Sequence, residues 1–329
     1  MRRLLLSLTA LPGLVSAPAA MAAATSEPSS YSALAALEAR VATIGFRLTT
    51  ANVGWCPVQQ PQFGWIWGDL RLYAAADRAA ARAAYGAGDG DTAFIAAVAP
   101  DSPAAKAGIG IGTPVTAIDG TAAPRGEGAD PFARITALEI LFAARPPQVP
   151  VKISGDGHPL DVTPIAGCAS DFRVEAVDRP MGIAKGRLVL ISKGLAEFAA
   201  SDEELAAAIA HELAHNILRH RARLDSAGVD RGLGKPFGRN ARLFKQTEVE
   251  ADRLSVWLLA GAGYDPHAAV RFWTRFGQRK GKPLFQAGTH PRWQDRIASF
   301  EGEIRAIDAA RAAGQPLAPP LIANPPPLE

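Results

Sequence analysis

The stretch AAAIAHELAHNILRH, residues 206–220, decides the fold expected for this chain. It places His211 and His215 four residues apart in an apolar run, with Glu212 directly after the first histidine. Four residues make about one turn of an α-helix, so both imidazoles project from the same side. Two histidines at this spacing can hold one zinc ion, and the adjacent glutamate can reach a water at the metal without ligating it.

The residues around this stretch predict that it is helical. Ser201 and Glu204 form a capping box, which starts a helix at about residue 201. The expected buried stripe consists of Leu205, Ala208, Ile209, Leu213 and Ile217. The alternative is an ordinary helix that carries two histidines at its surface or at the edge of the core.

A catalytic zinc needs a third protein ligand and one open position. In the metzincin pattern a histidine would follow His215 by six residues, but Arg221 stands there. His220 is at the wrong angle to join the pair. We expect it to be an exposed residue at the helix end, where a positive charge suits the helix dipole.

An acidic cluster in KQTEVEADRLSVWLLAGAGYDP, residues 245–266, offers better candidates. Glu248, Glu250 and Asp252 are expected to open a second helix. Because Glu248 and Asp252 are four residues apart, they share one face. Glu248 could ligate zinc while Asp252 accepts the second ring N–H of a ligand histidine. The alternative is three acidic residues that favour a helix N-terminus.

Length and composition bound the other possibilities. The chain has 329 residues, which is enough for about two domains. Hydrophobic residues make up 48% and charged residues 20%, so the chain is not of a disordered class. The formal charge is +3, and loss of Arg2 and Arg3 with a leader would make it +1, with 33 basic and 32 acidic residues. This balance gives no reason to expect a nucleic-acid or anionic-membrane partner.

The first residues, MRRLLLSLTALPGLVSAPAAMAAATS, have the pattern of a secretory signal that is cleaved after about Ala22. A retained membrane anchor is the alternative, but Pro12 and Pro18 interrupt the run. No later stretch is apolar and long enough to span a bilayer. We therefore expect a periplasmic or secreted mature protein with no transmembrane segment. Cys56 and Cys168 are then expected to form one disulfide, with two buried thiols as the alternative.

The segment between the cysteines resembles a PDZ domain of bacterial envelope proteases. PDSPAAKAGIGIGTPVTAIDG, residues 100–120, carries the resemblance, which covers residues 64–166. A strand is expected in front of it, a helix at about 132–144, and a hairpin after that helix. The resemblance implies that an extended peptide, such as a C-terminus, adds to a sheet edge beside the helix. The alternative is a module that only packs on the rest of the chain.

Further motifs connect the helix at 201–217 to a known family. HELAH, then EVEAD, then GYDP and GTHPRWQDRI resemble the gluzincin metallopeptidases that include HtpX, BepA, the Oma proteases and the prenyl-protein (CAAX) protease. The resemblance covers about residues 170–300 and favours a soluble periplasmic branch. It implies His211, His215 and Glu248 as the ligands of one Zn²⁺ per chain, with Glu212 as general base. DRPMGIAKGR, residues 178–187, departs from the family, because it lacks the Asn-Ala of the strand that pairs with substrate.

Two further residues, His290 and Arg296, lie near the end of this region. His290, in THPRW, matches a recurring His-Pro of the family. It could be catalytic as a donor to the oxyanion, occupy the open zinc position in a resting form, or be a structural turn residue. Arg296 is expected to pair with acidic residues of the active helix.

The expected fold class is α+β: a mainly helical zincin peptidase domain with a small sheet, and an inserted β-rich PDZ-like domain. The expected divisions are a signal peptide at 1–22 and an N-terminal segment at 23–63 that packs on the peptidase domain. The PDZ-like domain is expected at 64–166, the peptidase domain at 167–312, and an extended, poorly ordered Pro-rich tail at 313–329.

The predicted function is a zinc-dependent endopeptidase that hydrolyses exported or misfolded envelope proteins, with polypeptides as its partners. The alternative is a periplasmic chaperone or binding protein with an idle or locked zinc site. A zinc hydrolase for a non-peptide bond is less favoured, because PDZ modules recognise polypeptide.

Overall fold

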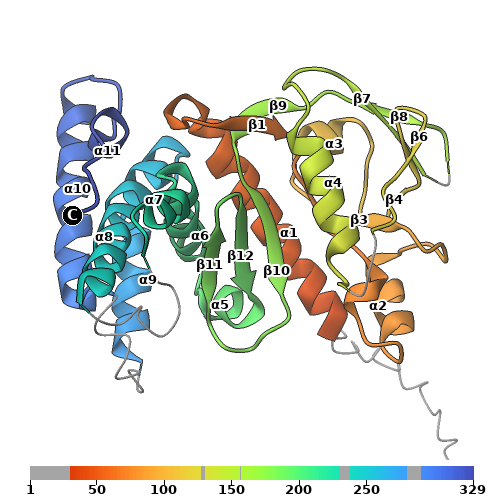
Figure 1. The fold of residues 1–329 in the computed structure, drawn as a ribbon, viewed down its shortest axis with the longest axis horizontal. Helices are drawn as coiled ribbons and strands as arrows, with labels where there is room; N and C mark the ends of the chain where they lie inside the picture. The colour runs from red at the N-terminus through yellow and green to blue at the C-terminus, as the bar shows by residue number, and fades with distance from the viewer. Residues whose placement is uncertain (1–29, 127–129, 156, 230–237, 280–289) are drawn as a thin grey trace, which may run out of the picture.

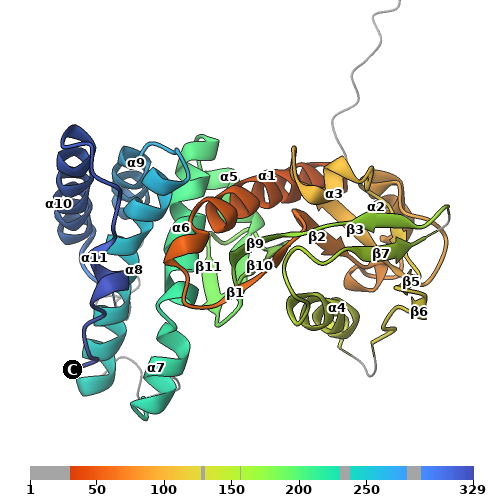
Figure 2. The same cartoon turned by 90° about the horizontal axis from the view of Figure 1, so that it is seen from above.

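A computed structural model describes residues 30–126, 130–155, 157–229, 238–279 and 290–329. The fold is α+β, as expected. Its buried apolar side chains form two large clusters. One is centred in a mainly helical part and extends to Ile66, Tyr85 and Phe94 of a β-rich part, and the other lies within the β-rich part. Figures 1 and 2 show these parts side by side, with the long helix α1 (Ser30–Ala51) between them. The predicted signal peptide, residues 1–22, lies outside the described residues.

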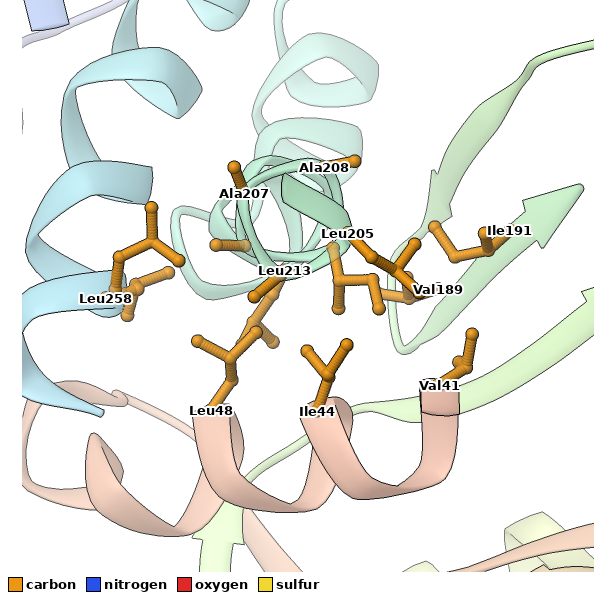
Figure 3. Close-up of a cluster of buried hydrophobic side chains, with 14 of the residues drawn as sticks. Val41, Ile44, Leu48, Val189, Ile191, Leu205, Ala207, Ala208, Leu213 and Leu258 are labelled. Atoms are coloured by element: carbon orange, nitrogen blue, oxygen red, sulfur yellow. The ribbon is translucent and has the colours of Figure 1, made fainter. Parts of the chain in front are cut away.

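Helix α6 (Asp202–Ile217) is the centre of the helical part. It contacts α1 and a three-stranded sheet on one side, and two further helices on the other. Figure 3 shows the resulting core, in which Leu205 and Leu213 of α6 meet Ile44 and Leu48 of α1. These four side chains are fully or almost fully buried. The helices that complete this part are α5 (Lys193–Phe198), α7 (His220–Ser226), α8 (Gly238–Gly261), α9 (His267–Gln278) and α10 (Trp293–Ala312).

Both ends of α6 follow from its sequence or backbone. The Ser201 hydroxyl accepts a hydrogen bond from the Glu204 backbone N–H, which confirms the predicted cap. The Glu204 carboxylate reaches back to the Ala200 N–H at 3.0 Å. At the other end, Arg219 takes a left-handed conformation with φ of 53°. That conformation breaks the helix and starts α7 in a new direction.

The small sheet of the helical part has the strand order β10–β12–β11. Strand β10 (Asp171–Glu175) runs parallel to β12 (Leu188–Ser192), and β11 (Gly182–Lys185) pairs with β12 in antiparallel register. Strand β11 is therefore an edge strand, and it lies against α6. This position brings the edge of the sheet to α6.

The β-rich part contains the elements that the sequence predicts between the cysteines. Ser102 caps a short helix through the Ala105 N–H, and Asp119 and Gly120 form a turn with φ of 49° and 79°. The predicted helix at 132–144 forms over Ala133–Ala143 as α4, and the hairpin forms as β7 (Val151–Ser154) and β8 (Leu160–Val162). The other elements are β2 (Trp65–Gly68), α2 (Arg78–Tyr85), β3 (Ala93–Val98), α3 (Pro103–Lys106), β4 (Pro114–Val115), β5 (Ala117–Ile118) and β6 (Thr121–Ala122).

The two parts are joined by a pair of strands and a disulfide. Strand β1 (Gln59–Gln62) pairs with β9 (Ile165–Cys168) in antiparallel register. Next to this ribbon, Cys56 and Cys168 form the predicted disulfide, with their Cα atoms 5.3 Å apart. The β-rich part therefore begins and ends at one covalently linked position.

The expectation of a poorly ordered tail is wrong. The described tail includes a short helix, α11 (Pro320–Ala323), and the Leu321 side chain is buried in the helical part. The carbonyl oxygens of Pro326 and Pro327 accept hydrogen bonds from α7 and α8. Pro-rich composition removes backbone donors, but carbonyls and apolar side chains are still available for docking. Within the described ranges, no helix is both long and apolar enough to cross a bilayer.

Candidate active site

Helices α6 and α8 bring together the three predicted ligands. His211 and His215 lie on α6, and their Nε2 atoms are 3.3 Å apart. Glu248 lies on α8, with carboxylate oxygens 3.3 Å from the His211 Nε2 and 3.6 Å from the His215 Nε2. Glu248 stands in the middle of α8, which starts at Gly238, so the expectation that these acids open the helix is wrong.

The spacing of these atoms fits a zinc ion. A tetrahedral zinc with nitrogen and oxygen ligands at about 2.0–2.1 Å separates neighbouring ligand atoms by about 3.3–3.4 Å. The three observed separations, 3.3, 3.3 and 3.6 Å, are close to this value. Two imidazoles and one carboxylate are a common donor set for catalytic zinc, and they leave a fourth position open. Among the described residues, this is the one group of His, Cys, Asp and Glu side chains whose geometry suits a metal.

The electrostatics of the three residues also favour a cation between them. Burial alone would lower the pKa of His211, but hydrogen bonds to Asp252 and Glu248 raise it to about 10. Burial lowers the pKa of His215 well below its usual value, so this imidazole keeps a free lone pair. Despite burial, the neighbouring histidines hold the pKa of Glu248 well below its usual range. The site therefore combines a neutral nitrogen ligand with a firmly ionised carboxylate.

Asp252 lies behind His211, one turn after Glu248. Its Oδ1 is 2.9 Å from the His211 Nδ1, so it can accept the second ring N–H and orient the imidazole. Arg296 of α10 holds the same carboxylate through Nη2 and Nε, at 2.5 and 2.7 Å. The expectation that Arg296 pairs with acids of the active helix is therefore wrong, because its partner is on α8. The Arg296 guanidinium also lies 3.4 Å from the centre of the Trp273 ring, which covers His211.

His220 lies behind His215, and the expectation that it is exposed is wrong. Only 2% of its side chain is exposed, and its Nδ1 is 2.8 Å from the His215 Nδ1. Its Nε2 is 3.1 Å from Glu250, which also pairs with Arg223. The left-handed Arg219 turns His220 inward. The sequence carries no glycine or other signal for that turn, so the position could not be found from the pattern.

Glu212 stands between the metal-ligand side of α6 and the edge strand β11. The Ala184 backbone N–H bonds to its carboxylate, and a Cβ placed on Gly182 would lie 2.5 Å from its Oε1. The strand therefore confines the carboxylate closely. Burial raises the pKa of Glu212 to about 7, which is the range expected of a general base at neutral pH.

His290, predicted to lie at the site, stands at its open side. Its Nε2 is 3.6 Å from a Glu248 oxygen, and about a third of its side chain is exposed. Residues 280–289, which precede it, lie outside the described residues. It is not one of the three residues whose ligand atoms lie together, so its roles as an oxyanion donor, a fourth metal ligand or a structural turn residue all stay predictions.

This geometry agrees with a family comparison. Residues 173–233 and 239–304 match the sequence model of peptidase family M48. The likeness to this family is therefore a property of this region and not of the whole chain. The match starts in β10 and ends in α10, so it contains α6, α8 and every side chain of the site described above.

The chain is also similar to three curated proteins. The chain is 30% identical to the mitochondrial metalloendopeptidase OMA1 of Schizosaccharomyces pombe, over 36% of this chain and 42% of that protein. It is 30% identical to the mitochondrial metalloendopeptidase OMA1 of Arabidopsis thaliana, over 34% of this chain and 26% of that protein. It is 29% identical to a putative beta-barrel assembly-enhancing protease of Vibrio cholerae, over 39% of this chain and 33% of that protein. The chain thus spans less than half the length of each relative.

Proposed function

We propose that this protein is a zinc-dependent endopeptidase that cleaves exported or misfolded envelope proteins. The observation that carries the proposal is the triangle of His211, His215 and Glu248, with Glu212 beside it at the edge of a sheet. His211, His215 and Glu248 would hold the metal. When bound, zinc would polarise the scissile carbonyl and acidify a water.

The chain's own residues would move the protons. Glu212 would take a proton from the attacking water on its carboxylate and pass it to the leaving amine nitrogen. Its pKa of about 7 suits both steps, because the group can accept and release a proton near neutral pH. Asp252 and His220 would keep the two ligand imidazoles oriented through their second ring nitrogens. His290 could donate a hydrogen bond to the developing oxyanion.

The substrate would bind as an extended strand. The outer edge of β11 is next to Glu212, and an extended peptide that paired there would place a backbone carbonyl close to the metal site. The β-rich part would recognise the same polypeptide as a PDZ-like module, in the narrow cleft between β2 and α4. Trp65, Trp67 and Phe142 line a small cavity there, of about 40 Å³, together with polar residues such as Glu139 and Asp171, so a peptide would have to widen it to bind.

Two features support the proposed compartment. Residues 1–22 have a secretory pattern, and the Cys56–Cys168 disulfide is typical of an oxidising compartment such as the periplasm. The proposed substrates are therefore polypeptides of that compartment.

A chaperone or binding protein with a locked site is the second candidate. It rests on His290, whose Nε2 is 3.6 Å from a Glu248 oxygen and would have to move closer to both ligand histidines to fill the fourth metal position. In that state the site would hold zinc without admitting substrate.

One experiment separates these functions. The purified protein is loaded with zinc and incubated with unfolded casein, beside Glu212→Gln and Glu248→Ala, with the exposed His267→Ala as control. We expect cleavage and one zinc per chain in the wild type, zinc without cleavage in Glu212→Gln, and neither in Glu248→Ala. Zinc binding without cleavage in the wild type, with activity appearing in His290→Ala, would support the locked form. Zinc retained by Glu248→Ala would refute Glu248 as the third ligand and direct the search to His290, whose Nε2 is 3.6 Å from a Glu248 oxygen.

A further inference from the structure

A chain of polar contacts runs from His215 to the last residues of the protein. His215 Nδ1 meets His220 Nδ1 at 2.8 Å, and His220 Nε2 meets Glu250 at 3.1 Å. Arg223 donates to Glu250 at 2.6 Å and to the Pro326 carbonyl at 2.7 Å. All residues in this series of contacts are described by the structure. The series ends at the backbone of the C-terminal tail.

The hydrogen-bond directions in this chain can be assigned from one requirement. If His215 presents the Nε2 lone pair to a metal, its Nδ1 carries the proton and donates to His220 Nδ1. His220 then carries its own proton on Nε2 and donates to the Glu250 carboxylate. Metal-bound histidines are commonly oriented by a carboxylate that accepts their second ring N–H. Here a second histidine, His220, stands between the ligand His215 and the carboxylate of Glu250.

The tail holds the far end of this chain at two points. Gln246 repeats the arrangement of Arg223: its amide donates to Glu250 at 2.9 Å and to the Pro327 carbonyl at 2.6 Å. Leu321 and Leu328 anchor the same segment through apolar contacts. Figure 2 shows the end of the chain beside α7 and α8. Residues 320–329 are called the tail segment below.

We propose that His220 is a positioning residue for the metal ligand His215, and that the docked tail segment fixes His220 through Arg223, Gln246 and Glu250. The proposal rests on the function proposed above, since it takes His215 as a ligand. Detachment of the tail segment would leave Glu250 with fewer fixed donors. His220, and then the His215 ring, would lose their fixed orientation. The tail segment would thus set how tightly the site holds its metal.

The first test measures zinc affinity of the metal-free protein by competition with a chelator. His220→Phe keeps a ring but removes both nitrogens, whereas His220→Asn keeps an amide oxygen that can accept from His215. We expect about 10–100-fold weaker zinc binding for His220→Phe and a partial recovery for His220→Asn, as is usual for residues that orient metal ligands. His267→Phe, on an exposed histidine, is the matched control and should bind zinc as the wild type does.

The second test uses a variant that ends at Pro325. It keeps the buried Leu321 but removes the carbonyls that hold Arg223 and Gln246. We expect weaker zinc binding in this variant, and little further weakening when the truncation is added to His220→Phe, because both changes act through one network. The Co²⁺-substituted proteins should show altered visible absorption in both variants.

The outcomes are distinguishable. A wild type that binds no zinc would refute the metal site and this proposal together. A wild type that binds zinc, with His220→Phe unchanged in affinity and absorption but lower in Tm, would overturn only the positioning role. If the truncation and His220→Phe each weaken zinc binding, and their effects on the binding free energy add fully in the double variant, the link to the tail segment would be refuted.

Discussion

Replacing Gly182 with alanine should slow peptide cleavage without removing the metal. Gly182 is the first residue of β11, and it has no positive φ that would strain an alanine backbone. A Cβ there would lie 2.5 Å from Oε1 of Glu212 and 3.0 Å from its Cγ and Cδ. Ordinary contact begins at 3.4 Å, so the carboxylate must retreat by about 0.9 Å (3.4 minus 2.5).

A misplacement of about 1 Å at a catalytic group can cost about 100-fold in rate. We therefore expect kcat to fall by about 10–100-fold in Gly182→Ala, which corresponds to about 1.4–2.7 kcal/mol of transition-state stabilisation. Zinc content should stay at the wild-type value, because Glu212 lies beside the ligands and is not one of the three.

The assay is cleavage of a fluorogenic peptide, with zinc content measured on the same samples. Gly110→Ala is the matched control, because nothing lies within 4 Å of its Cβ position. In a Glu212→Gln background, Gly182→Ala should cause no further loss, since the base is already absent. An unchanged kcat in Gly182→Ala, or the same fold loss in both backgrounds, would refute the reasoning.

Three further predictions concern the metal and the stability of the fold. Asp252→Asn should weaken zinc binding about 10–100-fold, because the carboxylate that orients His211 loses its charge; chelator competition measures this, and an unchanged affinity would contradict it. Burial raises the pKa of Glu38 from 4.5 to about 7, so the folded state holds a proton that the unfolded chain releases above about pH 4.5. The free energy of unfolding should therefore decrease as pH rises from about 4.5 to 7. In Glu38→Gln this decrease should be smaller by about 2–3 kcal/mol. Urea unfolding at pH 5 and 8 tests this, and equal pH dependence in both proteins would be the contrary result. Replacing Cys56 and Cys168 with serine should lower the free energy of unfolding by up to about 4–5 kcal/mol, because the disulfide closes a loop of 112 residues. Denaturant unfolding measures this, and a midpoint equal to that of the wild type would contradict the prediction.

Local patterns predicted much of this molecule. The capping box, the apolar stripe and the HExxH spacing indicated α6 with its histidines on one face, and the structure shows them there. Ser102, the Asp119-Gly120 turn and the helix at α4 are further cases in which a few neighbouring residues determine the backbone. These features depend on local hydrogen bonds and on helical or strand periodicity, so they can be read without the rest of the chain.

Other expectations failed because distant residues decide them. Whether Arg296 meets acids on α6 or Asp252 on α8 depends on how α10 crosses these helices. His220 was expected in solvent, but a left-handed Arg219, which no glycine announces, turns it into the site. The tail was expected to be loose, yet Arg223 and Gln246 offer donors to its carbonyls.

The sequence by itself therefore determined the class of chemistry: two histidines one helical turn apart, a glutamate beside them and a second acidic motif are properties of short stretches. The tertiary structure alone decided the partners of each of these groups. Only the packing of α6 against α8 brings Glu248 within 3.6 Å of both histidines, and only the docked tail completes the contacts behind His215. The physical reason is that a side chain's type follows from the sequence, whereas its orientation, burial and pKa depend on residues that are far away along the chain.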